Sequence, residues 1–195
     1  MAESQESEQP DQPSLKELTA DSPAELKLRV NTFLNGLGKG NTYDWSDKRF
    51  DFMLRDSNYH TTYIEKDGQI TAAIDYQVSE NGTINTFRAR TIPQESKGHF
   101  GKTGKTLGDE LFDHMLKTNP SAKSLYAEVT PDGYKYLKRQ VQRRGLAVVT
   151  NDQPNETGFG VIRINLNREQ QAARARIQKL RVLKASLGKT QKPAA

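Results

Sequence analysis

The stretch YHTTYIEKDGQITAAIDYQVSENGTINTFRARTI, residues 59–92, gives the framework for reading the whole sequence. In its middle part, apolar side chains recur at every second position, as they do in a strand with one buried face. The pairs Asp67-Gly68 and Asn81-Gly82 interrupt the stretch twice, and such pairs favour two-residue hairpin turns. The stretch therefore predicts a three-stranded antiparallel meander, with strands at 59–65, 69–78 and 84–92.

Two helices are predicted before this meander. The first spans 22–37, where Ser22 is a candidate cap and Pro23 suits the first helical position. Its apolar residues recur at spacings of three and four, and glycines follow it. The second spans 45–54, with Ser46 as its cap.

The pattern changes after the meander. A polar, glycine-bearing loop leads into a helix that ends at Asn119-Pro120. A short strand, a further helix and two more strands follow, at 124–129, 131–144, 146–150 and 158–166. This order predicts an α/β fold with a mixed, mainly antiparallel sheet and helices on both faces.

The loop at 93–105 combines three glycines with lysines directly before a helix. Backbone amides at a helix N-terminus bind anions, and glycines allow the anion a close approach. A nucleotide P-loop is excluded, because Ser96 and His99 occupy the positions at which that motif requires its first glycine. Two interpretations remain open, an anion cradle and an ordinary solvated loop.

The element order over residues 22–166 resembles the GNAT N-acetyltransferase superfamily. In that family, a loop with Gln or Arg, two residues, Gly, one residue and then Gly or Ala holds the pyrophosphate of acetyl-CoA. The matching segment is HFGKTG, residues 99–104. His99 stands in place of Gln or Arg, and Lys102 in place of the middle glycine. A register that ends at Gly101 is the alternative.

The resemblance implies acetyl-CoA as co-substrate. The end of the third strand, residues 88–91, would pair with the pantetheine arm, and the amides of residues 101–106 would bind the pyrophosphate. Acetyl transfer would take place in a splayed gap between the strands 84–92 and 124–129. The cofactor-binding candidates are Arg90, Thr91, His99, Phe100, Gly101, Lys102, Thr103, Gly104, Lys105 and Thr106.

Catalysis of this kind needs a base for the acceptor ammonium and an acid for the leaving thiolate. Many family members place a tyrosine four residues before the glycine that ends the penultimate helix. Here that position is Val141, before Gly145, so Tyr136 is the candidate acid and Tyr134 fits the core instead. Glu128 is the candidate base, and strand alternation predicts that it shares a face with Tyr126. A solvent-exposed strand carboxylate is the alternative for Glu128.

The composition narrows the chemistry further. The 195 residues include no cysteine and three widely spaced histidines, so we expect no thiolate nucleophile, disulfide or metal site. No run of residues is long and apolar enough for a membrane span, and the N-terminus does not read as a secretory signal. These features predict a soluble, cytoplasmic protein.

Charge divides the chain into three parts, with boundaries at 1–21, 22–166 and 167–195. Residues 1–25 carry seven acids and one base, and apolar side chains are scarce up to Leu15. We therefore predict an acidic, disordered tail at 1–21, with disorder strongest up to Pro13. The middle part is predicted to be one acetyltransferase-like domain.

The C-terminal part is basic, with eight bases and one acid from Arg168 onward. Asn167 and Gly188 fit the two ends of a helix with a narrow apolar stripe. Such a helix at 168–187 could dock on the domain or on a second copy, contact nucleic acid through phosphates, or lie on an anionic membrane.

Two functions of different class follow. The first is an acetyl-CoA-dependent N-acetyltransferase that modifies an amine on a protein or a small molecule. The second is a non-catalytic acetyltransferase-like protein that uses the basic helix on nucleic acid or in an assembly, as a phage accessory or virion protein would. In that case the location would be the host cytoplasm or the virion.

Overall fold

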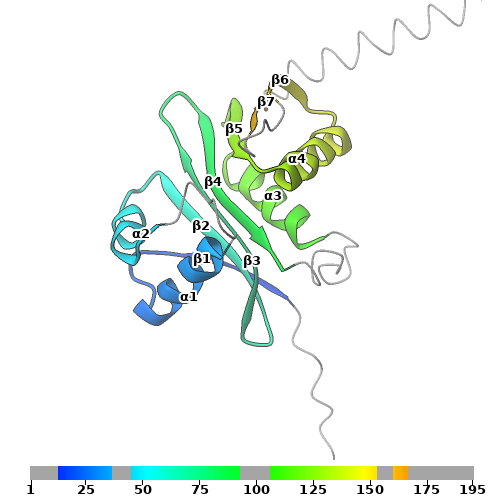
Figure 1. Ribbon diagram of the computed structural model, residues 1–195. Coiled ribbons are helices and arrows are strands. Elements are labelled where there is room, and N and C mark those ends of the chain that lie inside the picture. Colours follow the sequence, from blue (N-terminus) through cyan, green and yellow to red (C-terminus); the bar gives the residue numbers. More distant parts are fainter. Residues whose placement is uncertain (1–12, 37–44, 93–105, 153–159, 167–195) are drawn as a thin grey trace, which may run out of the picture. The chain divides into compact units, whose positions relative to one another are not determined.

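The structure is a computed structural model that describes residues 13–36, 45–92, 106–152 and 160–166 (Figure 1). The chain divides into two compact units, Met1–Ser121 and Ala122–Ala195. Each unit is described by itself. The predicted loop residues 99–105 and the predicted basic helix 168–187 lie outside the described residues.

The first unit contains a four-stranded antiparallel sheet in the order β1-β2-β3-β4. The predicted meander is confirmed. In the Asp67-Gly68 turn both residues have positive φ angles, 50° and 71°, as a type I′ hairpin turn requires. Its strands are β1 (Ser14–Leu18), β2 (Tyr59–Lys66), β3 (Gln69–Val78) and β4 (Thr83–Thr91).

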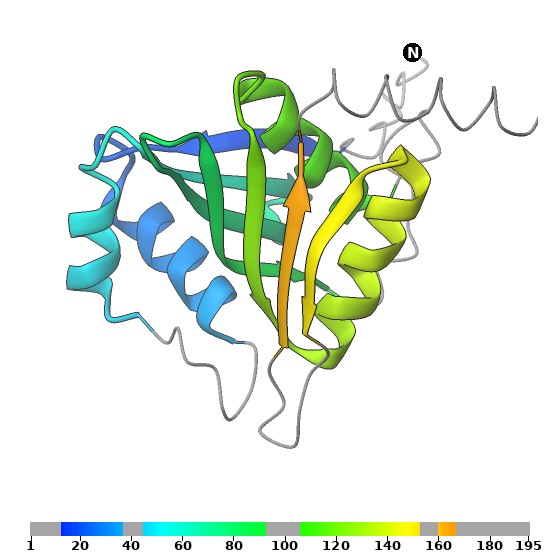
Figure 2. The same cartoon turned by 90° about the horizontal axis from the view of Figure 1, so that it is seen from above.

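Helices cover both faces of this sheet, as Figures 1 and 2 show. Asp75 on β3 is linked through Arg88 to α1, whereas the hydroxyl of the next residue, Tyr76, lies 3.3 Å from that of Thr118 on α3. Successive strand residues point to opposite faces, so α1 and α3 lie on opposite sides. The helices of this unit are α1 (Ala24–Asn35), α2 (Asp47–Met53) and α3 (Leu107–Thr118).

Strand β1 is a correction to the predicted disordered tail at 1–21. Residues 14–18 pair with β2, and Leu18 is buried in the core cluster. The ammonium of Lys16 also lies 2.6 Å from the Glu65 carboxylate. The acidic composition suggested disorder, but backbone pairing with an existing strand needs only a few apolar contacts to hold a short edge strand.

The two helices predicted before the meander are confirmed with small differences at their ends. Ser46 caps α2, since its hydroxyl accepts a hydrogen bond from the Arg49 amide. Ser22 does not cap α1; Pro23 occupies that position, and the Ser22 hydroxyl accepts from the Thr19 amide instead.

The second unit contains an antiparallel sheet in the order β5-β7-β6 and one helix, α4. The predicted bounds of the first strand and of the helix are both confirmed. Gly145 ends the helix in the left-handed conformation, with φ at 60°. The elements are β5 (Ser124–Val129), α4 (Pro131–Arg144), β6 (Ala147–Asp152) and β7 (Gly160–Asn165). With seven strands and four helices described, the predicted mixed α/β fold is confirmed.

Candidate functional site

Helix α3 begins directly after Thr106, the last residue of the predicted pyrophosphate segment 101–106. Thr106 is its N-cap, and its hydroxyl accepts a hydrogen bond of 3.2 Å from the Asp109 amide. In return, the Thr106 amide donates to the Asp109 carboxylate over 3.1 Å. This reciprocal pair is a capping box. The Thr106 amide, predicted to contact pyrophosphate, is therefore already bound to a carboxylate.

The electrostatics of this helix end follow from the same residues. A helix N-terminus favours negative charge, and here two acidic side chains, Asp109 and Glu110, lie in the first turn. Asp109 is buried, with 4% of its surface exposed. Its carboxylate thus takes the place at Thr106 that an incoming phosphate would need.

The predicted pantetheine strand ends with Arg90 and Thr91, which point to opposite faces of β4. The Arg90 guanidinium donates to the Phe33 carbonyl over 2.7 Å and lies 5.0 Å from the centre of the Phe33 ring. It also packs against Gly36 so closely that an added Cβ would collide with Arg90 Nη1. The Arg90 side chain therefore fastens the C-terminal end of α1, while Thr91 pairs with Ala72 on β3.

Arg88, at the start of the same segment, is part of the core. Its side chain and that of Asp75 are both fully buried. Arg88 donates to the Asp75 carboxylate through its backbone amide and through Nε, each at 2.7 Å, and the Tyr59 hydroxyl donates to the same carboxylate at 2.8 Å. The Arg88 amide is therefore taken up within the sheet and is unavailable to a pantetheine arm.

Burial raises the pKa of the Asp75 carboxyl, and the Arg88 guanidinium and the hydrogen bonds to the carboxylate oppose this shift. Burial and the adjacent carboxylate also raise the pKa of the Tyr59 hydroxyl. Tyr59 therefore stays protonated and donates to Asp75 at any ordinary pH.

The same guanidinium reaches α1 from its other side. Arg88 Nη1 donates to the side-chain oxygens of Asn31 and Asn35, the first at 2.8 Å. Both amides then donate to the Trp45 carbonyl, at 2.9 and 2.8 Å, and the guanidinium lies 4.5 Å from the Trp45 ring centre. We call this set the Arg88 network. Its members are Asn31, Asn35, Trp45, Tyr59, Asp75 and Arg88.

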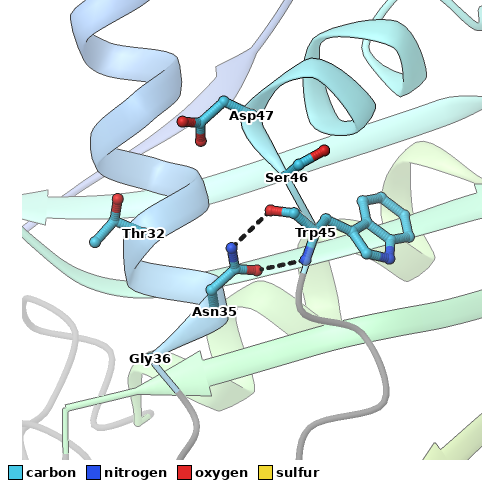
Figure 3. Close-up of a pocket in the computed structure, with 6 residues that line it drawn as sticks. All are labelled: Thr32, Asn35, Gly36, Trp45, Ser46 and Asp47. Carbon is cyan, nitrogen blue, oxygen red and sulfur yellow. Dashed lines mark hydrogen bonds between the residues drawn. The ribbon is translucent and has the colours of Figure 1, made fainter.

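A shallow, open cavity of about 530 Å³ lies beside this network (Figure 3). Figure 3 shows how the Asn35 amide holds the Trp45 backbone at its edge, through both its oxygen and its nitrogen. The lining residues are Thr32, Asn35, Gly36, Trp45, Ser46 and Asp47.

The predicted catalytic residues both belong to the second unit. Tyr126 and Glu128 share one face of β5, as expected from alternation, and the Tyr126 hydroxyl lies 3.4 Å from the Glu128 carboxylate. Partial burial and this carboxylate raise the pKa of Tyr126. Tyr136 is half-buried on α4, and Tyr134 is in the core as predicted.

The structure does not bring Glu128 and Tyr136 together within this unit. Ala127 and Val129 are buried in the core that α4 covers, so Glu128, between them, projects from the other face of the sheet. Tyr126 is the tyrosine that shares that face.

No family model and no curated protein matches the sequence. Solved structures do match it. The diaminobutyrate acetyltransferase of Paenibacillus lautus, solved with its substrate and coenzyme A, is 11% identical with a TM-score of 0.58. This match covers 80% of this chain and 95% of that one.

Two further structures agree. The N-acetyltransferase of Staphylococcus aureus Mu50 is 10% identical with a TM-score of 0.57, and the match covers 78% of this chain and 96% of that one. The Campylobacter jejuni N-acetyltransferase PseH, solved with acetyl coenzyme A, is 16% identical with a TM-score of 0.50, at coverages of 80% and 99%. The chain has the fold of the GNAT N-acetyltransferases. The resemblance drawn from the element order is thereby confirmed at the level of the fold.

The Arg88 network was not predicted from the sequence. One signal was available, because Asp75 interrupts a strand whose side chains are otherwise mostly apolar or small, and Arg88 lies on the next predicted strand. Among the described residues, no group of His, Asp or Glu side chains is arranged to hold a metal ion. None of the described helices is long and apolar enough to span a bilayer.

Proposed function

We propose that this chain is an acetyl-CoA-dependent N-acetyltransferase that moves an acetyl group to an amine of a protein or small molecule. The fold is the observation that carries the proposal. Structures with the same fold include enzymes solved with coenzyme A or acetyl coenzyme A. A bound acetyl-CoA would supply the acetyl group as a thioester.

In this proposal, the first unit contributes the backbone at the end of β4 and the loop at 99–106. The Arg90 side chain is engaged with α1, so it stiffens the strand end and leaves ligand contacts to the backbone around Thr91. The Thr106 amide contributes nothing while Asp109 holds it. Pyrophosphate binding would then depend on the amides and lysines of residues 99–105.

The second unit contributes the acid–base pair. Glu128 is exposed and accepts the proton of the acceptor ammonium, directly or through a water. Tyr126 is a better placed proton donor than the initial candidate Tyr136, because it shares the face of Glu128. Its raised pKa keeps the phenol protonated at neutral pH, as a general acid requires.

Steady-state kinetics with a panel of amines tests these roles. We expect Glu128→Gln to lower kcat/KM about 100-fold or more, and Tyr126→Phe to lower kcat. Tyr136→Phe should retain nearly full activity. Glu80→Gln, which changes another exposed carboxylate, is the matched control. Equal effects of Glu128→Gln and Glu80→Gln would remove Glu128 from the mechanism.

One observation favours a second candidate, the non-catalytic acetyltransferase-like binding protein. The Asp109 carboxylate opposes a phosphate at the start of α3. Calorimetry with acetyl-CoA, and with CoA as a control, separates the two candidates. Micromolar binding that Gly104→Leu abolishes supports the enzyme. Absence of binding at millimolar acetyl-CoA supports the binding protein, and the role of the basic segment 168–187 on nucleic acid or a protein partner would be tested next.

A further inference from the structure

The two compact units carry opposite net charge. Residues 1–121 contain 14 basic and 19 acidic side chains, a net charge of −5. Residues 122–195 contain 15 basic and 5 acidic side chains, a net charge of +10. The positive charge of the whole chain therefore comes from the second unit, and its described part places much of that charge on α4.

Helix α4 separates its apolar and basic side chains by face. Tyr134, Leu137 and Val141 are buried, at spacings of three and four. The basic side chains recur at the same spacing on the exposed side, where residues three and four apart are neighbours. We call this exposed set the α4 basic stripe. Its members are Lys135, Lys138, Arg139 and Arg143.

Few acidic groups oppose this stripe within the described part of the unit. Asp132 lies 3.4 Å from Lys135, but the two side chains are 95% and 73% exposed. Such a solvent-exposed ion pair contributes little stabilisation, so a more highly charged anion can replace Asp132 beside Lys135. Glu128 projects from the face of the sheet that α4 does not cover.

The stripe is also held in a fixed shape. Its helix has a capping Thr130 hydroxyl at one end and a left-handed glycine at the other. The Lys138 ammonium lies 5.9 Å from the centre of the Tyr134 ring, which limits its freedom. Members three or four residues apart are separated by about 4.5 to 6 Å along the helix, from a rise of about 1.5 Å per residue.

We propose that the α4 basic stripe binds the phosphate backbone of a nucleic acid. A row of cations on one rigid helix matches a row of phosphates, and contacts of this type are independent of sequence. The stripe holds neither an aromatic side chain for base stacking nor an apolar one for insertion into a lipid surface. A polyanion with closely spaced charges is therefore the fitting partner, in preference to a membrane.

Fluorescence anisotropy on the full chain tests this proposal. The probes are a labelled DNA duplex of about 20 base pairs and a second duplex with its sequence shuffled, titrated between about 50 and 200 mM salt. The variant is K135Q/K138Q/R139Q. The matched control, K48Q/R55Q/K117Q, removes the same charge from exposed positions of the first unit. Circular dichroism verifies that both variants fold.

We expect the parent chain to bind both duplexes equally. The stripe variant should lose at least about tenfold in affinity, and its slope of log K against log salt should fall by about 2 to 3, as for three lost phosphate contacts. The control should change far less. Equal losses in both variants would overturn the proposal, because they would reflect net charge alone. Loss of binding to phosphatidylserine vesicles with unchanged DNA binding would overturn it in favour of a membrane surface.

Discussion

The two compact units differ in what they bury. The first unit encloses a charged pair, Asp75 and Arg88, among several buried polar side chains. In the described part of the second unit the buried side chains are apolar apart from Gln140, whose amide oxygen accepts a hydrogen bond from Arg144. The first unit keeps charge inside, and the second carries it on the surface of α4.

The two units therefore depend on different sources of stability, a buried polar network in the first and apolar packing with capped helix ends in the second. A buried charge is costly unless every neighbouring group is arranged to satisfy it, so the Arg88 network fixes the geometry of α1, β3 and β4 together. The second unit relies on apolar packing and on good helix ends. We therefore expect the first unit to be sensitive to the loss of a partner, and the second to backbone conformation.

The largest effect should come from breaking the buried pair. Asp75→Asn or Arg88→Met alone leaves an uncompensated polar group in the core, and each should cost about 3–5 kcal/mol in unfolding free energy. The double variant should cost less than the sum of the two, because it removes both charges. Urea unfolding measures all three.

An exposed ion pair provides the comparison for that experiment. Arg55 lies 2.9 Å from Asp51 on the surface of the first unit. Arg55→Gln should leave the urea midpoint almost unchanged, since water already screens this pair. If it destabilised the protein as much as Arg88→Met, burial would not be the cause.

Two glycines, Gly133 within α4 and Gly145 at its C-terminal cap, test the role of backbone conformation in the second unit. At Gly145 a Cβ would meet no atom within 4 Å, but the positive φ disfavours any L side chain. Gly145→Ala should therefore cost about 1–2 kcal/mol. At Gly133, inside the helix, an added Cβ makes ordinary contacts, the nearest 3.4 Å from the Thr130 hydroxyl. Gly133→Ala should stabilise by up to about 1 kcal/mol.

Thermal unfolding of the two alanine variants measures this difference. The unfolding temperature should fall for Gly145→Ala and rise for Gly133→Ala. A Gly145→Ala variant as stable as the parent would contradict the assignment of a left-handed requirement to Gly145, and a destabilised Gly133→Ala variant would contradict the expectation for Gly133.

The smallest effect should be a pH dependence in the first unit. His60 is half-buried and stacks on Tyr76 at 5.2 Å between ring centres, and burial lowers its pKa below the usual 6.5. The folded state therefore binds this proton more weakly than the unfolded state. Stability is full above pH 6.5 and declines as the pH falls through the lowered pKa.

Urea midpoints at pH 7.5 and 5.5, for the parent and for His60→Gln, test this assignment. The parent should lose more stability at the lower pH than the variant does. The same decline in both proteins would assign it to another group.

The parts of the fold that local chemistry determines could be predicted from the sequence. Turn pairs such as Asp67-Gly68, the Thr and Pro at the start of α4 and its terminal Gly145 each specify a backbone conformation within a few residues. Strand β1 could not be predicted, because its order comes from pairing with β2. The Arg88 network likewise depends on which residues the register places opposite one another, with a bulge beside Asp75.

The candidate site also has features that local sequence predicts and features that depend on contacts between distant residues. Alternation correctly placed Tyr126 and Glu128 on one face. The sequence could not show that the Arg90 side chain holds the end of α1, since that contact joins residues 57 positions apart. The glycine–lysine loop before α3 indicated an anion site at the helix N-terminus. It did not indicate that the Asp109 carboxylate of the first turn would itself accept the hydrogen bond from the Thr106 amide. Residues 93–105 lie outside the described structure, so their role stays a prediction.

The position of Trp45 makes the first unit observable in isolation. It is the single tryptophan of the chain, and it is 2% exposed beside the Arg88 guanidinium. Its emission therefore reports on the first unit alone, whereas the far-ultraviolet dichroism of the helices reports on both. Coincident fluorescence and dichroism transitions would mean that the two units unfold as one cooperative body, and separate transitions would give each its own stability.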